Sequence, residues 1–215
     1  MKTRIAVLVS GSGTNLQALI DAAADPSFPA EIAVVLSNRP KAYGLERARL
    51  AGLKTEVLRH RAFDSREAFD AALVGVLNQY QVSWVCLAGF MRLLTPTFLD
   101  SFPGRVLNIH PALLPAFPGT HGQEQALEYG VRVAGATVHF VDSGTDTGPI
   151  IAQAVVPVNQ DDAPESLKQR ILAQEHRLYP MVLRMACEGR LKIEGRTVRV
   201  NLAAGESTLL WGMEP

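Results

Sequence analysis

Short apolar runs that alternate with helix-like stretches constrain the fold of this chain more than any other feature. The run RIAVLVS (4–10) is rich in valine, which is typical of a strand buried on both faces of a parallel sheet. Helix-like and strand-like stretches then alternate, at 16–24, 31–38, 42–52, 55–59, 64–80, 82–89, 95–102 and 105–110. This alternation predicts an α/β fold with a doubly wound, mostly parallel sheet flanked by helices.

The pattern changes in the second half of the chain. After a helix expected near 121–130, two strand-like runs, 135–142 and 149–158, are joined only by SGTDTG. That connection is too short for a helical crossover, so it predicts an antiparallel pair. The remaining stretches predict a long helix over 163–189 with a kink at Pro180, a small hairpin over 190–200 and a loose tail over 201–215.

Composition and charge narrow the classes of partner. Lys+Arg and Asp+Glu both number 21, which argues against wrapping nucleic acid by bulk charge but allows a local site for one phosphate. No segment has 18 uninterrupted apolar residues, so we expect no membrane-spanning helix. Cys86 and Cys187 stand apart, which favours a reducing, cytoplasmic setting, and no Cys/His cluster has the spacing of a metal site.

The loop GSGTN, from Gly11 to Asn15, follows the first strand and precedes a helix. Glycines there let backbone amides point at a phosphate near the helix N-terminus. The dinucleotide pattern GxGxxG is not met, because Leu16 occupies its last position, and the second strand ends in SNRP without an acid for a ribose. The loop therefore favours a single phosphate on a small ligand, and the alternative is a tight turn that binds nothing.

Asn108 and His110 stand two apart on a predicted strand, so their side chains share one face. Three prolines follow this pair, at 111, 115 and 118. Each restricts its own φ and the conformation of the residue before it, so together they would hold Asn108 and His110 in one arrangement. An amide and an imidazole together can donate hydrogen bonds to a developing oxyanion, and a histidine can also move a proton. The alternative is a strand-end histidine satisfied by local backbone.

Asp146 lies in the glycine-flanked turn SGTDTG. An aspartate there often only stabilises the turn, but a carboxylate near His110 would favour the imidazolium form. We interpret His139 as a core or sheet-face residue, and His121 either begins a helix or belongs to the site.

Six segments in order resemble the phosphoribosylglycinamide formyltransferases, a folate-dependent family of purine synthesis. The resemblance covers about the first 195 residues, in VLVSGSGTNLQALI, FDSREAFD, LAGFMRLL, NIHPALLPAFPGTHG, VHFVDSGTDTGPII and QEHRLYP. It implies one formyltransferase domain over 1–200, with a phosphate-binding half of about 1–104 and a folate and catalytic half of about 105–200, before the tail.

The resemblance also implies the reaction and its residues. Formyl would pass from 10-formyltetrahydrofolate to the amino group of glycinamide ribonucleotide, with no metal, no membrane or nucleic-acid partner, and a monomer or homodimer as the active form. Asn108, His110 and Asp146 would be catalytic. The ribonucleotide would contact Gly11, Ser12, Gly13, Thr14, Asn15 and Glu175. The folate would contact Arg66, Met91, Arg92, Leu93, Leu94, Asn108, Val141 and Asp142.

Three other readings share part of this pattern. Methionyl-tRNA formyltransferases carry a further C-terminal domain, and formyltetrahydrofolate deformylases usually carry an N-terminal one, so the length of this chain makes both less expected. The hydrolase nevertheless stays the enzymatic alternative. A non-catalytic nucleotide-binding module would need the glycine loop but none of the three catalytic positions.

Overall fold

The computed structural model describes residues 1–212 and divides into two compact units. Unit 1 comprises Met1–Asn108, and unit 2 runs from Ile109 onward. The boundary falls inside one strand, β5 (Val106–His110).

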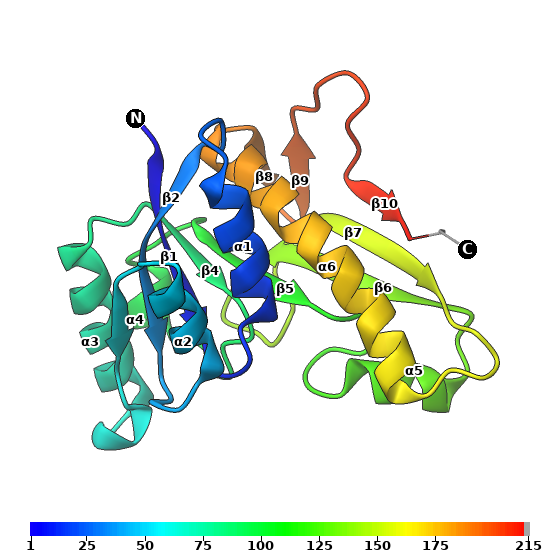
Figure 1. Cartoon of the computed structure of the whole chain (residues 1–215), viewed down its shortest axis with the longest axis horizontal. Helices are drawn as coiled ribbons and strands as arrows, with labels where there is room; N and C mark the ends of the chain where they lie inside the picture. The colour runs from blue at the N-terminus through cyan, green and yellow to red at the C-terminus, as the bar shows by residue number, and fades with distance from the viewer. Residues whose placement is uncertain (213–215) are drawn as a thin grey trace. The chain divides into compact units, whose positions relative to one another are not determined.

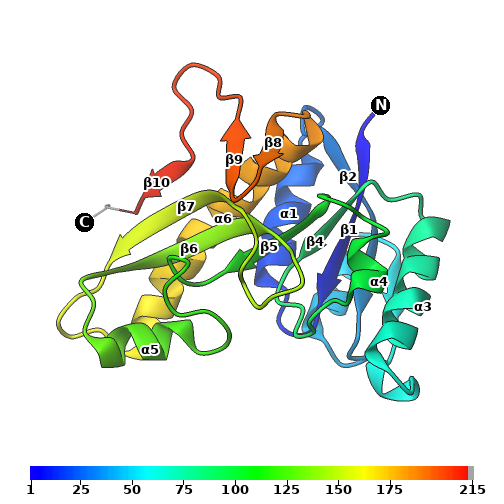
Figure 2. The same cartoon turned by 180° about the vertical axis from the view of Figure 1, so that it is seen from behind.

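Unit 1 is an alternation of strands and helices, as the sequence predicts. Its other elements are β1 (Thr3–Val9), α1 (Thr14–Ala24), β2 (Ala30–Ser37), α2 (Tyr43–Leu50), β3 (Thr55–Val57), the 3-10 turn η1 (His60–Ala62), α3 (Arg66–Gln79), β4 (Trp84–Leu87) and α4 (Pro96–Leu99). The strands pair in the order β5-β4-β1-β2-β3, and every one of these pairs is parallel. Helices α1 and α2 cover one face, and α3 and α4 cover the other (Figures 1 and 2).

The core of unit 1 explains its continuous apolar runs. Residues 5–9 of β1 are fully buried, because this central strand has helices on both faces. Leu16 and Leu19 of α1 are buried on one face of the sheet, and Phe69 of α3 is buried on the other. In a parallel sheet, the residues after the strands gather at one edge, where open α/β proteins bind their ligands.

Unit 2 contains an antiparallel pair. Its elements are α5 (Gly122–Tyr129), β6 (Val133–Phe140), β7 (Ile150–Pro157), α6 (Pro164–Cys187), β8 (Leu191–Glu194), β9 (Thr197–Val200) and β10 (Leu209–Trp211). Strands β6 and β7 pair antiparallel, with Ala136 opposite Ala154. Helix α6 crosses one face of this pair, and the β8–β9 hairpin lies on the opposite face (Figures 1 and 2).

The predicted fold class is confirmed. The strand order β10-β7-β6-β5-β4-β1-β2-β3 belongs to a mostly parallel sheet with an antiparallel pair, and β8–β9 is the predicted hairpin. The helix predicted over 95–102 is wrong in length, since α4 spans only Pro96–Leu99.

The loose tail predicted over 201–215 is also wrong in part. Leu209–Trp211 form β10, which pairs parallel with β7, and residues 213–215 lie outside the described part of the chain. The free edge of β7 supplies the partners: the Gln153 amide bonds to the Thr208 carbonyl, and the Gly212 amide to that of Val155. A three-residue strand made by such pairing has no hydrophobic period of its own to predict it.

Candidate active site

The glycine loop of unit 1 is shaped by a close approach between two helices. Gly13 is the N-cap of α1 and has φ +71°, a conformation that favours glycine. A Cβ on Gly13 would lie 2.6 Å from the Cα of Gly44 at the start of α2. The Gly44 amide donates to the Gly11 carbonyl at 3.0 Å. The loop is therefore fixed by backbone packing, and a side chain at position 13 would force the two helix starts apart.

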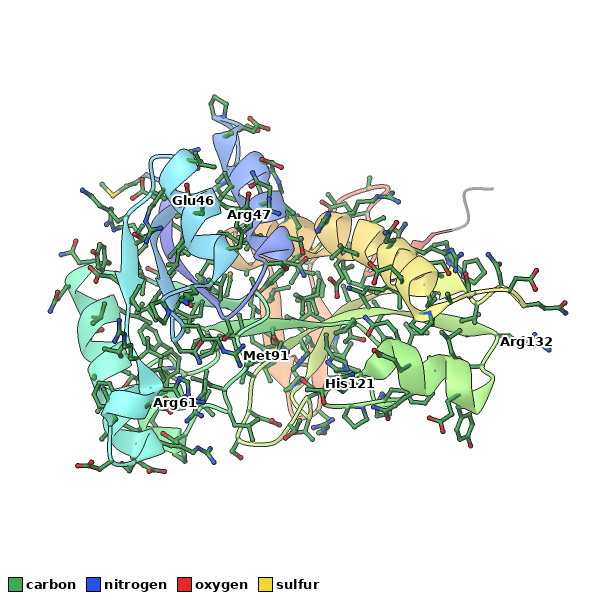
Figure 3. The ribbon with its side chains drawn as sticks, turned by 60° about the horizontal axis from the view of Figure 1, so that its bottom comes forward. Glu46, Arg47, Arg61, Met91, His121 and Arg132 are labelled. Atoms are coloured by element: carbon green, nitrogen blue, oxygen red, sulfur yellow. The ribbon has the colours of Figure 1, made fainter. Side chains whose placement is uncertain are left out.

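Arg47 of α2 holds the same loop from the side. Its Nε donates to the Ser12 carbonyl at 2.9 Å, and its guanidinium lies 5.1 Å from the centre of the Tyr43 ring. The side chain extends from α2 toward the start of α1 (Figure 3). Gly11 and Ser12 are exposed, so a ligand can approach this part of the loop. The loop has the properties expected of a phosphate site at a helix N-terminus.

The segment after β4 presents apolar side chains to solvent. Met91 is 58% exposed and Leu93 is 49% exposed, whereas Leu94 is buried. The Arg92 guanidinium lies 5.9 Å from the centre of the Phe69 ring. Exposed apolar side chains of this size are the lining that a flat ring system would cover. Arg66, also predicted to contact folate, is the exposed first residue of α3.

In unit 2, the structure brings His110 and Asp146 together. The His110 Nδ1 lies 3.3 Å from the Asp146 Oδ2, and the side chains are only 5% and 13% exposed. The other ring nitrogen, Nε2, lies 2.9 Å from the Phe117 carbonyl oxygen. A neutral imidazole can donate to only one of these two acceptors, whereas an imidazolium can donate to both. His110 therefore faces one acceptor at each ring nitrogen.

The Asp146 carboxylate is stabilised by several donors. Burial disfavours its charge and is the largest single influence on its pKa. The nearby His139 ring, a hydrogen bond from the Gly119 amide at 2.8 Å, and the charges of His110 and His139 together outweigh burial, so the pKa of Asp146 is lowered. Asp146 also has φ +53°, which is uncommon for a residue with a side chain. The turn is thus held in a conformation that aims this carboxylate at the two histidines.

His139 is a member of this cluster that the sequence did not identify. It is buried on β6, as predicted, but its Nε2 lies 3.7 Å from the Asp146 Oδ1. Its Nδ1 lies 2.7 Å from the Phe140 carbonyl oxygen. We call His110, His139 and Asp146 the carboxylate cluster. The sequence of an apolar strand that contains a histidine does not indicate that the histidine will contact an aspartate seven residues later.

The proline-containing segment after His110 is anchored by a buried hydroxyl. The Thr137 Oγ1 donates to the Ala112 carbonyl at 2.7 Å and accepts from the Leu114 amide at 3.1 Å. The Gln153 Nε2 donates to both the Thr137 Oγ1 and the Leu114 carbonyl. Stiffness in this segment therefore comes from β6 and β7 as well as from the prolines. It fixes the stretch whose Phe117 carbonyl and Gly119 amide contact the carboxylate cluster.

The turn that carries Asp146 is closed by Asp142. The Asp142 Oδ1 accepts from the Gly144 amide at 3.1 Å and from the Thr147 hydroxyl at 2.6 Å. The carboxylate predicted to contact folate thus organises the turn itself, and Val141 precedes it directly after β6. Gly148 is required by packing, because a Cβ there would lie 1.8 Å from the Phe140 carbonyl oxygen.

The remaining candidate residues have clear positions. Asn108 precedes His110 by two residues on β5, so the alternation of the strand gives both the same face. Glu175 is buried on α6. His121 is the exposed N-cap residue of α5.

Residues 1–212 contain neither a metal-binding cluster nor a helix that could span a membrane. No group of three or more His, Cys, Asp or Glu side chains there is arranged to hold a metal ion. None of the helices in that range combines the length and apolar character needed to cross a bilayer.

The chain is similar to known proteins over most of its length. The formyl transferase family model matches residues 3–183. Phosphoribosylglycinamide formyltransferase of Escherichia coli is 48% identical over 189 residues, covering 88% of this chain and 89% of that protein. The trifunctional purine biosynthetic protein adenosine-3 of Bos taurus is 45% identical over 192 residues, and this chain spans only 19% of its length. The crystal structure of glycinamide ribonucleotide transformylase 1 from Symbiobacterium toebii superposes with a TM-score of 0.91 at 58% identity, over 93% of this chain and 94% of that one.

Proposed function

Because the chain belongs to the formyl transferase family, as its motifs predict, we propose that it transfers formyl from 10-formyltetrahydrofolate to glycinamide ribonucleotide in purine biosynthesis. The observation that carries the proposal is the His110–Asp146 pair at 3.3 Å, at the end of a strand that also bears Asn108. Similarity to the E. coli enzyme over nearly the full length of both chains supports the choice of substrate.

The two substrates have separate subsites in this proposal. The ribonucleotide phosphate is bound by the glycine loop, Gly11 to Asn15, with Glu175 contacting the same substrate. The exposure of Gly11 and Ser12 supports that role. The folate ring is covered by Met91 to Leu94, with Arg66, Asn108, Val141 and Asp142 as further contacts. The exposed side chains of Met91 and Leu93 support this assignment.

The reaction we propose is a direct transfer. The amino nitrogen of the ribonucleotide attacks the formyl carbon, a C–N bond forms, and the carbonyl electron pair moves onto the oxygen. The Asn108 amide and protonated His110 donate hydrogen bonds to that oxyanion, and one such donor typically lowers the barrier by about 3–4 kcal/mol. His110 would release the Phe117 carbonyl to do so, while Asp146 keeps the ring charged and oriented.

Collapse of the tetrahedral intermediate completes the transfer. The electron pair on oxygen re-forms the carbonyl, the bond between the formyl carbon and N10 of the folate breaks, and tetrahydrofolate leaves. The proton lost by the attacking nitrogen passes to N10 through Asp146 and water. No formyl-enzyme is needed, because the substrate amine is itself the nucleophile.

A direct assay tests the proposal. Purified protein is mixed with both substrates, and formylated ribonucleotide and tetrahydrofolate are measured together; omission of the ribonucleotide is the control. Equal amounts of both products support the transferase. Tetrahydrofolate without formylated ribonucleotide would replace this proposal with the hydrolase. Binding of the ribonucleotide without either product would favour the non-catalytic module.

A further inference from the structure

Ser10 connects the glycine loop to the segment that carries Met91. It follows β1, directly precedes Gly11 and is only 3% exposed. Its Oγ accepts a hydrogen bond from the Met91 amide at 2.9 Å. Its own amide donates to the Gly89 carbonyl at 3.1 Å. One buried residue thus forms two hydrogen bonds to the backbone of the segment after β4.

The same hydroxyl is oriented by a second buried side chain. The Ser10 Oγ donates to the Asn38 Oδ1 at 2.6 Å, and Asn38, just after β2, is also only 3% exposed. The Asn38 Nδ2 lies 3.2 Å from the Nδ1 of His60, the first residue of η1. We call Ser10, Asn38 and the Met91 amide the hydroxyl bridge. It joins the connections that follow β1, β2 and β4, three neighbouring strands at the edge where ligands bind.

A buried serine in this sheet does not need long-range partners. Ser37, at the end of β2, is completely buried, yet its Oγ bonds only to the backbone of Arg39, two residues away. Ser10 instead reaches residue 91, which is 81 positions later. Its hydroxyl donates one hydrogen bond, to Asn38, and accepts one, from the Met91 amide. The contrast separates a serine that closes a local turn from one that fixes two loops relative to each other.

We propose that Ser10 is a positioning residue that sets the folate-contacting segment at Met91 relative to the ribonucleotide-binding glycine loop. The inference rests on the proposed function, which assigns the two subsites. Without the hydroxyl, the Met91 amide loses its buried acceptor, so the segment shifts or admits water. The hydroxyl bridge contains none of the groups proposed to act on the formyl carbon, so binding is affected and the chemical step is not.

The test is steady-state kinetics of Ser10→Ala with Ser37→Ala as the matched control. In Ser10→Ala, the KM for 10-formyltetrahydrofolate should rise about tenfold, the KM for the ribonucleotide should rise less, and kcat should stay within about twofold of wild type. Ser37→Ala should leave the folate KM within about twofold. Asn38→Ala, which removes the acceptor of the Ser10 hydroxyl together with the contact to His60 but keeps the acceptor of the Met91 amide, should raise the folate KM by about threefold.

Amide hydrogen exchange adds a measurement that needs no substrate. Exchange at Met91 should be faster in Ser10→Ala than in wild type and unchanged in Ser37→Ala. An unchanged folate KM in Ser10→Ala and Asn38→Ala, or an equal rise in Ser37→Ala, would overturn the inference while an active wild type keeps the proposed function. Wild-type protein that forms no product would overturn both. If Ser10→Ala does not fold, Asn38→Ala with the exchange data decides the question.

Discussion

The hydroxyl bridge of unit 1 and the carboxylate cluster of unit 2 both bury polar groups, but with different chemistry. In the bridge, a serine, an amide side chain and a backbone amide satisfy one another without a net charge. In the cluster, a single carboxylate faces two imidazoles, and each ring also faces a backbone carbonyl. The three groups of the bridge do not themselves titrate, whereas the cluster has a charge that protons can change.

The difference suggests a division of labour between the two regions. Buried neutral hydrogen bonds position a loop and affect binding when they are removed. Buried ionisable groups respond to neighbouring charge and are the usual site of proton transfer. Changes at the hydroxyl bridge should therefore appear mainly in KM, and changes at the carboxylate cluster should appear in kcat and in pH dependence.

Asp146→Asn should give the largest loss of kcat. A small loss would contradict the assignment of the chemical step to the carboxylate cluster. The substitution keeps the size of the side chain but removes the charge that faces both histidines. We expect kcat to fall by about 10³-fold while both KM values change by less than about fivefold. The measurement is the formyl-transfer assay at saturating substrates.

Asp162→Asn is the matched control for that variant. Asp162 is also an aspartate of unit 2 whose pKa is lowered, chiefly by its hydrogen bonds with Arg170, the nearer at 2.7 Å. Its loss should reduce stability by about 1–2 kcal/mol and leave kcat unchanged. A similar loss of kcat in both variants would mean that stability, and not the charge of the cluster, explains the result.

The two glycines of the loop should separate folding from binding in unit 1. Gly13→Ala places a Cβ 2.6 Å from the Cα of Gly44 in a backbone that favours glycine, so it should destabilise the protein by about 2–4 kcal/mol. Gly11→Ala meets no atom within 4 Å, so its stability should change by less than about 1 kcal/mol. Its KM for the ribonucleotide should nevertheless rise, because the phosphate is proposed to approach that backbone. Denaturant unfolding and kinetics of both variants check this, and a stable Gly13→Ala would contradict it.

Unit 1 was predictable from sequence because its signals are local. The apolar run at 4–10 and the glycines after it identify a buried strand, a turn and a helix without any distant contact. The part of the fold that was missed, β10, depends on backbone pairing with β7 about 55 residues earlier. A strand that forms because it pairs with the edge of another strand has little sequence pattern of its own from which it could be predicted.

The site shows the same limit. His110 and Asp146 were identified from their motifs, and the structure adds that they lie 3.3 Å apart. His139 and Ser10 were missed, because each looks like an ordinary buried residue of a strand or strand end. Their importance arises from partners 7 and 81 residues away, and no periodicity records such contacts.

The pH dependence of stability sharpens the comparison. The pKa of Asp146 is lowered below its ordinary value of 3.8, so the ionised carboxylate stabilises the folded state. This contribution is complete above about pH 5 and is lost as the pH falls through the lowered pKa. The unfolding free energy of wild type minus that of Asp146→Asn should therefore shrink between pH 5 and pH 2. The same difference for Ser10→Ala should stay constant, and a gap for Asp146→Asn that widens toward low pH would show that the sign is wrong.

The smallest effect is expected at the tip of the β8–β9 hairpin. The Arg196 Nη1 donates to the Thr147 carbonyl at 2.5 Å, next to Asp146, and Arg196 itself is exposed. Water competes for an exposed contact, so Arg196→Ala should lower kcat by only about two- to threefold, through a looser turn. Arg199→Ala is the control, because Arg199 lies on the same hairpin and its side chain pairs with Glu194 of that hairpin, away from the turn of Asp146. Equal kcat values in the two variants would mean that only the buried contacts of the cluster hold Asp146 in position. A loss confined to Arg196→Ala would extend that support to a hairpin 50 residues later in the chain.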